Sequence, residues 1–204
     1  MSKVRLIIVL CVVAPLCGCA ARSAERTGFL SDYSKLEPRS EVSYRYVAQD
    51  RLGQYSKFII DPVEIHLHRR SKAKKKTSGE DRTDLKNYMH AALVKAIEDS
   101  YEVVYRSGPG VARARVALTD IKKANVLLNI HPGSKIMGTG LGGASLEAEL
   151  VDSQTSEQIA ALVESQLGDR LALDGLSTWG DAKAIMDGWA SRFRERLDEA
   201  HGRL

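Results

Sequence analysis

The sequence predicts an α+β domain, with an antiparallel sheet of about four to five strands and two amphipathic helices packed on one face. Several stretches alternate apolar and polar residues with a period of two, which is typical of strands with one buried face. Two longer stretches repeat apolar residues every three or four positions, which is typical of helices that bury one stripe. Because most strand stretches follow one another directly, we expect antiparallel pairing.

The predicted strands begin with a stretch in which Val63, Ile65 and Leu67 alternate with polar residues. The full set lies at 58–67, 101–106, 111–120, 144–150 and a last strand with Ile159, Ala161 and Val163 at alternate positions. Arg113 and Arg115 point outward from the third stretch, as Glu147 and Glu149 do from the fourth. If these two strands are neighbours, opposite charges face each other across the open side of the sheet.

The two predicted helices cover residues 81–100 and about 178–200. Their apolar stripes are Leu85, Met89, Leu93 and Ile97 in the first and Ala182, Ile185, Met186, Trp189, Phe193, Leu197 and Ala200 in the second. Thr178 with Asp181 resembles a capping box that would open the second helix. Upstream, residues 29–36 place four apolar residues at helical spacing, which predicts a short turn that docks on the domain. These are Phe29, Leu30, Tyr33 and Leu36.

The first eighteen residues have the features of an export signal. Lys3 and Arg5 precede an apolar run over 6–16, which is shorter than the roughly 20 residues that span a bilayer. This combination predicts a secretory signal peptide. An ordinary signal peptide cleaved after Gly18 or Ala20 is one interpretation.

The end of the signal segment favours a second interpretation, a lipoprotein signal peptide. Leu16-Cys17-Gly18-Cys19 resembles the lipobox of bacterial lipoproteins, and the resemblance implies cleavage before Cys19 and lipidation of that cysteine. All three cysteines lie within the first nineteen residues, so the exported part has no thiol for a disulfide or a cysteine nucleophile. Ala20 and Ala21 follow without an aspartate, which by resemblance to enterobacterial sorting rules implies the outer membrane.

We therefore divide the chain into a signal peptide over 1–18, a lipidated cysteine with a tether and lead-in segment over 19–57, and one domain over 58–204. Beyond the signal peptide, 28 of the 30 Lys and Arg residues remain against 26 acidic ones. Six of these basic residues lie within positions 69–76. They are Arg69, Arg70, Lys72, Lys74, Lys75 and Lys76. The basic balance is therefore local, so it does not argue for a nucleic-acid partner.

Two groups of residues are candidate binding sites. His66 and His68 lie on one face of the first predicted strand beside Glu64, and two such imidazoles bind zinc when a third ligand joins them. The common alternative is the solvated face of a strand. The basic run over 69–76 is expected to form a loop. One interpretation is that this loop binds anionic surfaces such as lipid head groups or lipopolysaccharide phosphates, and the more common one is a solvated loop without a role.

No motif of an enzyme stands out. The sequence has no G-x-S-x-G and no H-E-x-x-H. Gly138 to Gly143 matches G-x-G-x-x-G, but a strand follows it where a dinucleotide-binding loop needs a helix. We therefore expect no cofactor and no catalytic residue.

Several separated motifs resemble one family of short bacterial lipoproteins, known as domain of unknown function 3313. The motifs are Gly28 to Tyr33, Asp61-Pro62-Val63, Gly108-Pro109-Gly110 with Arg113 to Asp120, Ala148 to Asp152, Trp179-Gly180-Asp181 and Trp189-Ala190. The resemblance implies a lipoprotein with a common fold and transfers no catalytic residue. The lysine-rich run is a departure from the family pattern.

These observations lead to one expected function and one alternative. The expected function is a non-catalytic, periplasm-facing outer-membrane lipoprotein that binds an envelope protein or the cell wall, held by the lipid on Cys19. The alternative, from another class, is a periplasmic lipoprotein that binds a small ligand, a lipid or a metal.

Overall fold

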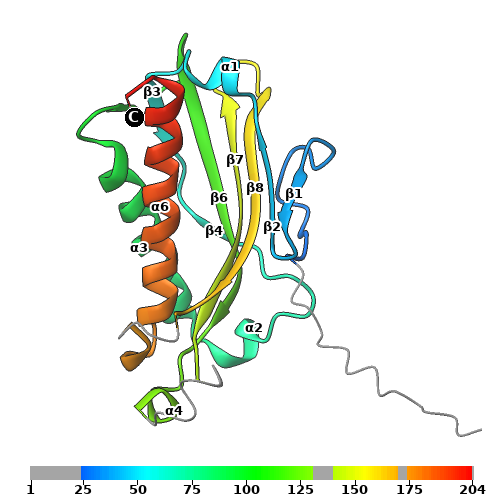
Figure 1. Ribbon diagram of the computed structural model, residues 1–204, viewed down its shortest axis with the longest axis vertical. Coiled ribbons are helices and arrows are strands. Elements are labelled where there is room, and N and C mark those ends of the chain that lie inside the picture. The colour runs from blue at the N-terminus through cyan, green and yellow to red at the C-terminus, as the bar shows by residue number, and fades with distance from the viewer. Residues whose placement is uncertain (1–23, 131–139, 170–173, 204) are drawn as a thin grey trace, which may run out of the picture.

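The structure is a computed structural model that describes residues 24–130, 140–169 and 174–203 of the 204-residue chain. One mixed sheet and two long helices make up most of this part (Figure 1). The strands are β1 Glu37–Ser40, β2 Ser43–Val47, β3 Lys57–Ile60, β4 Glu64–Ile65, β5 Glu102–Val103, β6 Val111–Lys122, β7 Gly143–Asp152 and β8 Gln158–Leu167. The α-helices are α1 Gln49–Leu52, α2 Ala73–Lys76, α3 Gly79–Ile97, α4 Val126–Ile130 and α6 Gly180–Ala200, with a 3₁₀ turn at Asp174–Leu176.

The sheet has eight strands in the described part of the chain, in the order β1-β2-β8-β7-β6-β3-β5, with β4 paired to β6. The predicted four to five strands were too few. Two of the added strands, β1 and β2, lie in the polar lead-in, where every β1 residue is exposed and every β2 residue is half-buried. A segment without a buried face shows no alternation, so the sequence did not indicate these strands.

The sheet is also not purely antiparallel, which corrects the second part of the fold prediction. The neighbours in the series β1, β2, β8, β7 and β6 pair antiparallel. In contrast, β3 and β4 run parallel to β6, and β3 runs parallel to β5. Parallel strands need a crossover connection, usually a helix, and α3 provides one between β3 and β5. The expected single strand over 58–67 is divided into β3 and β4, because Asp61-Pro62-Val63 interrupts it.

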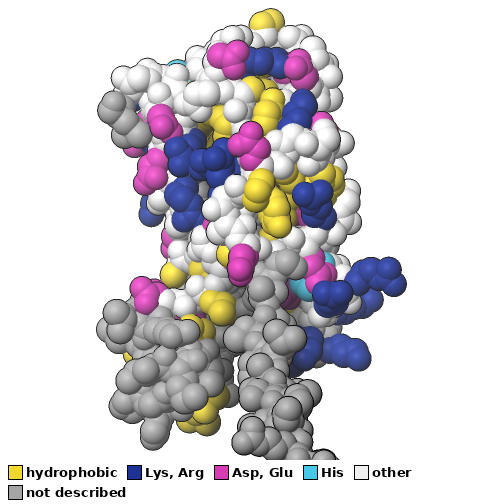
Figure 2. All heavy atoms as spheres, turned by 45° about the vertical axis from the view of Figure 1, so that its right-hand side comes forward, with side chains coloured by type: hydrophobic (Ala, Val, Ile, Leu, Met, Phe, Trp, Pro, Cys, Tyr) yellow, Lys and Arg dark blue, Asp and Glu magenta, His cyan; other side chains and the backbone are white. Residues whose placement is uncertain are grey.

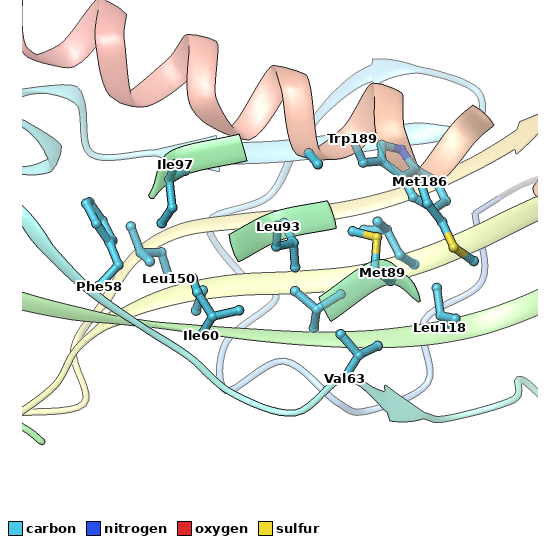
Figure 3. Close-up of a cluster of buried hydrophobic side chains, with 14 of the residues drawn as sticks. Phe58, Ile60, Val63, Met89, Leu93, Ile97, Leu118, Leu150, Met186 and Trp189 are labelled. Atoms are coloured by element: carbon cyan, nitrogen blue, oxygen red, sulfur yellow. The ribbon is translucent and has the colours of Figure 1, made fainter. Parts of the chain in front are cut away.

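Helices α3 and α6 lie side by side on one face of the sheet (Figure 1), as predicted. The whole α3 stripe of Leu85, Met89, Leu93 and Ile97 is buried, and α6 buries Ile185, Met186, Trp189 and Leu197. Figure 3 shows side chains of both helices against those of the strands. The labelled ones are Met89, Leu93 and Ile97 of α3, Met186 and Trp189 of α6, and, among the strand residues, Phe58, Ile60, Leu118 and Leu150. Burying one such side chain contributes about 1.5–3 kcal/mol, so this layer accounts for most of the stability.

The start of α3 is held by a capping box. Ser78 Oγ accepts a hydrogen bond from the Asp81 backbone N–H at 2.9 Å, and Asp81 accepts one from the Ser78 N–H at 2.8 Å. Asp81 also accepts from Trp179 Nε1 at 3.0 Å and pairs with Lys123 at 3.1 Å. The hydrogen bond from the Ser78 backbone, followed by the bonds from Lys123 and Trp179, holds the pKa of Asp81 below its ordinary value.

The expected capping box of Thr178 and Asp181 on the last helix was wrong. The residue before α6 is Trp179, which makes no capping bond with its side chain. Asp181 is 1% exposed and accepts a hydrogen bond from the Gly142 backbone N–H at 2.6 Å. Its carboxyl group occupies space beside Gly168, where an added Cβ would lie 2.3 Å from Asp181 Cγ. Asp181 therefore joins the start of α6 to the strand ends.

The last strand, β8, presents its residues differently from the prediction. Ile159 belongs to the core under the helices, whereas Ala161 and Val163 belong to a second cluster on the opposite face. The pairing of β7 with β8 changes register between Leu150 and Val151, opposite this part of β8. A register shift alters which face successive residues occupy.

No helix in the described ranges combines the length and apolar character that a membrane span requires.

Candidate functional site

The face of the sheet away from the helices is covered by residues 24–36, which we call the docked segment (Figure 1). Phe29 and Leu30 are each 5% exposed, and Tyr33 and Leu36 pack beside them. The predicted docking of these four residues is confirmed. Phe29 lies between the Arg115 guanidinium, 5.0 Å from its ring centroid, and the edge-on ring of His66 at 5.2 Å.

Two buried glutamates of β7 hold the backbone of the docked segment. Glu147 is fully buried and accepts hydrogen bonds from the backbone N–H groups of Thr27 and Phe29 and from the Tyr33 hydroxyl. Tyr33 in turn accepts from the N–H groups of Gly28 and Leu30, at 2.8 and 3.2 Å. Burial, and then the hydrogen bond to Glu147, raises the pKa of Tyr33.

Glu149 continues the same pattern two residues further along β7. It accepts from the Ser31 backbone N–H at 2.9 Å, the Ser31 hydroxyl at 2.6 Å and Gln158 Nε2 at 2.9 Å, and it pairs with Arg115. Backbone N–H groups of residues 27, 29 and 31 thus all point toward these carboxylates. This alternation is what an extended segment provides, since successive groups point to opposite sides.

The sequence placed these glutamates on an open face, and that placement was wrong in one respect. They do lie on the face away from the helices, and Arg115 faces Glu149 as expected. The docked segment covers both, however, so that Glu147 and Glu149 are 0% and 3% exposed. Arg113 pairs with Asp61 at 2.7 Å instead of with a glutamate of β7.

The predicted histidine pair makes separate contacts. His66 Nε2 lies 2.8 Å from Glu64 Oε2 at the surface. His68 lies 2.9 Å from Glu25 in the docked segment and 3.7 Å from Asp120. Over the residues that the structure describes, no three His, Cys, Asp or Glu side chains form a group that could hold a metal ion.

The basic run is partly helical, so the expectation of a plain loop was wrong. Helix α2 buries Ala73 and leaves Lys74, Lys75 and Lys76 exposed. Arg70 is exposed and lies 3.2 Å from Glu25. Basic side chains project from the lower right of the molecule in Figure 2. Through Glu25, the start of the docked segment therefore lies beside the basic run.

The predicted lipidation residue, Cys19, lies outside the described residues. Five peptide steps separate it from Ala24, the first residue of the docked segment and a buried one. A fully extended chain of that length reaches at most about 18 Å. A lipid on Cys19 would therefore keep this end of the domain close to a membrane.

The contacts of Glu147 and Glu149 are the part of this site that sequence reasoning missed. The apolar spacing of Phe29, Leu30, Tyr33 and Leu36 indicated that something docks, but carried no information about where. The arrangement holds a peptide segment. It is suited to fixing the N-terminal part of the chain on the domain.

Comparison with known proteins gives one family and several distant structures, two of which are described below. A family model described as "Protein of unknown function (DUF3313)" matches residues 25–193. No curated protein sequence matches the chain. The fold is similar to the PelC dodecamer from Paraburkholderia phytofirmans, with 8% identity and a TM-score of 0.46 over 76% of this chain and 95% of that one. It is also similar to protein XCC0632 from Xanthomonas campestris, with 9% identity and a TM-score of 0.40 over 73% and 86%. At these TM-scores the two similarities support no argument about function.

Proposed function

The chain belongs to the DUF3313 family of proteins of unknown function, and we propose that it is a non-catalytic binding module of the cell envelope. In this proposal Cys19 carries the lipid that anchors the protein in the outer membrane, and the domain faces the periplasm.

The observation that carries the proposal is the docking of residues 24–36 directly after the lipobox-like sequence. A flexible tether would let the domain move far from its anchor. Here the buried glutamates and Phe29 fix the chain from about residue 25 onward. A domain held in this way keeps one end beside the bilayer and presents the rest to partners in the periplasm.

Each buried methylene of a lipid chain contributes about 0.8 kcal/mol to membrane binding. A cysteine that carries several acyl chains is therefore a stable anchor, and one acyl chain alone is not. The basic run supports the same orientation, since Arg70 contacts Glu25 near the tether. Anionic head groups attract basic residues at about 1 kcal/mol each.

The proposal is tested by metabolic labelling with palmitate and by membrane fractionation. We expect label on the wild-type protein and on Cys17→Ala, and none on Cys19→Ala, which should move to the soluble periplasmic fraction. Cys17→Ala is the matched control, because it removes a neighbouring thiol and keeps the predicted acylation residue. Label that persists on Cys19→Ala, or is absent from the wild type, contradicts the proposal. Sucrose-gradient separation of the two membranes then tests the outer-membrane assignment.

A further inference from the structure

An apolar pocket of about 250 Å³ lies between α6 and the sheet, and its lining on β7 extends to Glu149, whose carboxylate the docked segment contacts. Its walls come from strands β1, β2, β6, β7 and β8 and from helices α1, α3 and α6. They include the side chains of Val47, Ala148, Ala160, Leu162, Trp189 and Phe193. Pockets that bind small ligands are mostly apolar with a few polar groups at fixed places, and this pocket has the same composition.

Four arginines surround the mouth of this pocket. They are Arg39 of β1, Arg45 of β2, and Arg192 and Arg196 of α6. Figure 2 shows Lys and Arg side chains gathered beside hydrophobic ones in the upper half of the molecule. Three of the arginines have carboxylate partners, at 3.0 Å for Arg39 with Glu37, 2.9 Å for Arg192 with Glu164 and 2.5 Å for Arg196 with Glu199.

Arg45 is different, because its side chain forms no hydrogen bond or ion pair with any described residue. It is half-buried. Burial, and then the charges of Arg196 and Arg39, lowers the pKa of Arg45, and the charges of Glu199 and Glu164 oppose this effect only in part. A partly desolvated guanidinium beside two others is unfavourable unless an anion joins it. The pocket mouth therefore has spare positive charge directly next to an apolar cavity.

The charge of Glu164 acts on Arg45 from a distance, but its carboxylate is bonded to other donors. Glu164 is 9% exposed and accepts from Trp189 Nε1 and Arg192 Nη2, both at 2.9 Å, and from Ser43 and Gln166. These donors occupy the carboxylate and hold Trp189 in the wall of the pocket. Glu164 thus shapes the pocket and leaves Arg45 to a ligand.

We propose that this pocket binds a single-chain amphiphile with an anionic head group. The acyl chain occupies the cavity under α6, and the head group accepts hydrogen bonds from Arg45, with Arg39 and Arg196 nearby. The inference rests on the proposed binding role of the domain and gives that role a ligand class. It does not depend on the lipid anchor, because the pocket is formed by the domain itself.

The test uses fluorescence of Trp189. The chain has two tryptophans, so Trp179→Phe leaves Trp189 as the sole reporter in the pocket wall. The full-length chain carrying Cys19→Ala, exported and purified without detergent, is titrated with decanoate, decanol and decyltrimethylammonium, each below its micellar concentration. We expect saturable binding of decanoate, at least tenfold tighter than either of the other two, and weakened by added salt.

Two substitutions then assign the binding to the site. Arg45→Gln should weaken decanoate binding about tenfold, as expected for the loss of a charge-assisted hydrogen bond, and leave decanol unchanged. Arg70→Gln removes an equal charge from the exposed basic run and should have no effect. Ala160→Leu fills the cavity and should abolish binding of both decanoate and decanol. Circular dichroism confirms that each variant is folded.

Several outcomes overturn the inference. They are equal affinity for all three probes, no binding of decanoate, or equal decanoate affinity in Arg45→Gln and Arg70→Gln. A dimer in light scattering that closes the pocket and excludes decanoate would also overturn it, because the occupant would then be a second copy. None of these results affects the palmitate experiment, so failure of the anchor and failure of the pocket are distinguishable.

Discussion

Glu147 and Glu149 lie under the docked segment, where an unpaired carboxylate would be strongly unfavourable. The docked segment supplies three backbone N–H groups and two hydroxyls to them, and Gln158 and Arg115 supply the remaining donors of Glu149. Without the docked segment Glu147 would lose all of these donors, and Glu149 would keep only Gln158 and Arg115. Removal of the docked segment from this face of the sheet would therefore change how the charges of Glu147 and Glu149 are solvated.

Glu147→Gln should release the docked segment. The amide keeps the size of the side chain but places an NH₂ group among donors, so that backbone N–H groups lose their acceptor. We expect a loss of about 1–3 kcal/mol in the free energy of unfolding and faster proteolysis within residues 24–36. Urea denaturation and timed digestion with mass spectrometry measure the two effects.

The matched control for this variant is Glu102→Gln. Glu102 is 59% exposed and pairs only with Lys57, and surface pairs contribute little. If both variants unfold and digest alike, the glutamates of β7 do not hold the segment.

The burial of Glu147 and Glu149 could be predicted only in part from the sequence. Glu147 and Glu149 alternate with apolar neighbours, and such alternation indicates a solvated face. The pattern correctly gave the face of the sheet to which they point. It could not show that another part of the chain covers that face, because the covering residues lie more than a hundred positions away.

Among the elements, α3 shows how its first turn is stabilised. Asp81 has a lowered pKa, so its contribution to stability is fully present above the unfolded-state pKa of about 3.9. It is lost as the pH falls through the lower folded-state pKa. The contribution is electrostatic and includes hydrogen bonds to Ser78 and Trp179.

Asp81→Asn should therefore destabilise the protein by about 1 kcal/mol at pH 7, and the difference from wild type should shrink below pH 4. Thermal unfolding between pH 2.5 and 7 measures this change. Asp84→Asn on the exposed side of α3 is the control and should give no comparable pH dependence. A constant difference across the whole range would rule out the capping role.

The elements that could be predicted are those with an unbroken period. The stripes of α3 and α6 and the alternation of β6 and β7 each have one face buried in a continuous core, so the sequence carries their geometry. Strands β1 and β2 lack such a face, and Pro62 interrupts the strand expected over 58–67. Asp181 was mistaken for a cap because its spacing from Thr178 is correct, while its tertiary contact with Gly142 leaves no local pattern.

At the scale of the molecule, the basic run and the start of the docked segment occupy one end of the domain. His68 and Arg70 both contact Glu25 there. If Cys19 carries the proposed lipid, the five peptide steps from Cys19 to Ala24 would keep the lysines of α2 near the membrane surface. This arrangement predicts binding to anionic lipid even without the lipid anchor.

The soluble Cys19→Ala protein should bind vesicles that contain anionic phospholipid, and binding should weaken as salt is added. Lys74→Gln with Lys75→Gln should reduce binding by about 1 kcal/mol per residue, measured by vesicle co-sedimentation. Lys86→Gln with Lys95→Gln on α3 removes the same charge elsewhere and should bind as wild type. Salt-independent binding, or equal loss in both double variants, would contradict the orientation.

The docked segment also constrains the order in which the chain folds. It joins residues 118 to 120 positions apart, and contacts that close such long loops form late because their entropy cost is large. Its acceptors, Glu147 and Glu149, are in place only after β7 has paired with its neighbours. The docked segment is synthesised long before β7, and it is nevertheless among the last parts of the domain to fold. Until then Phe29 and Leu30 remain exposed, so chaperones and proteases can recognise the incompletely folded domain.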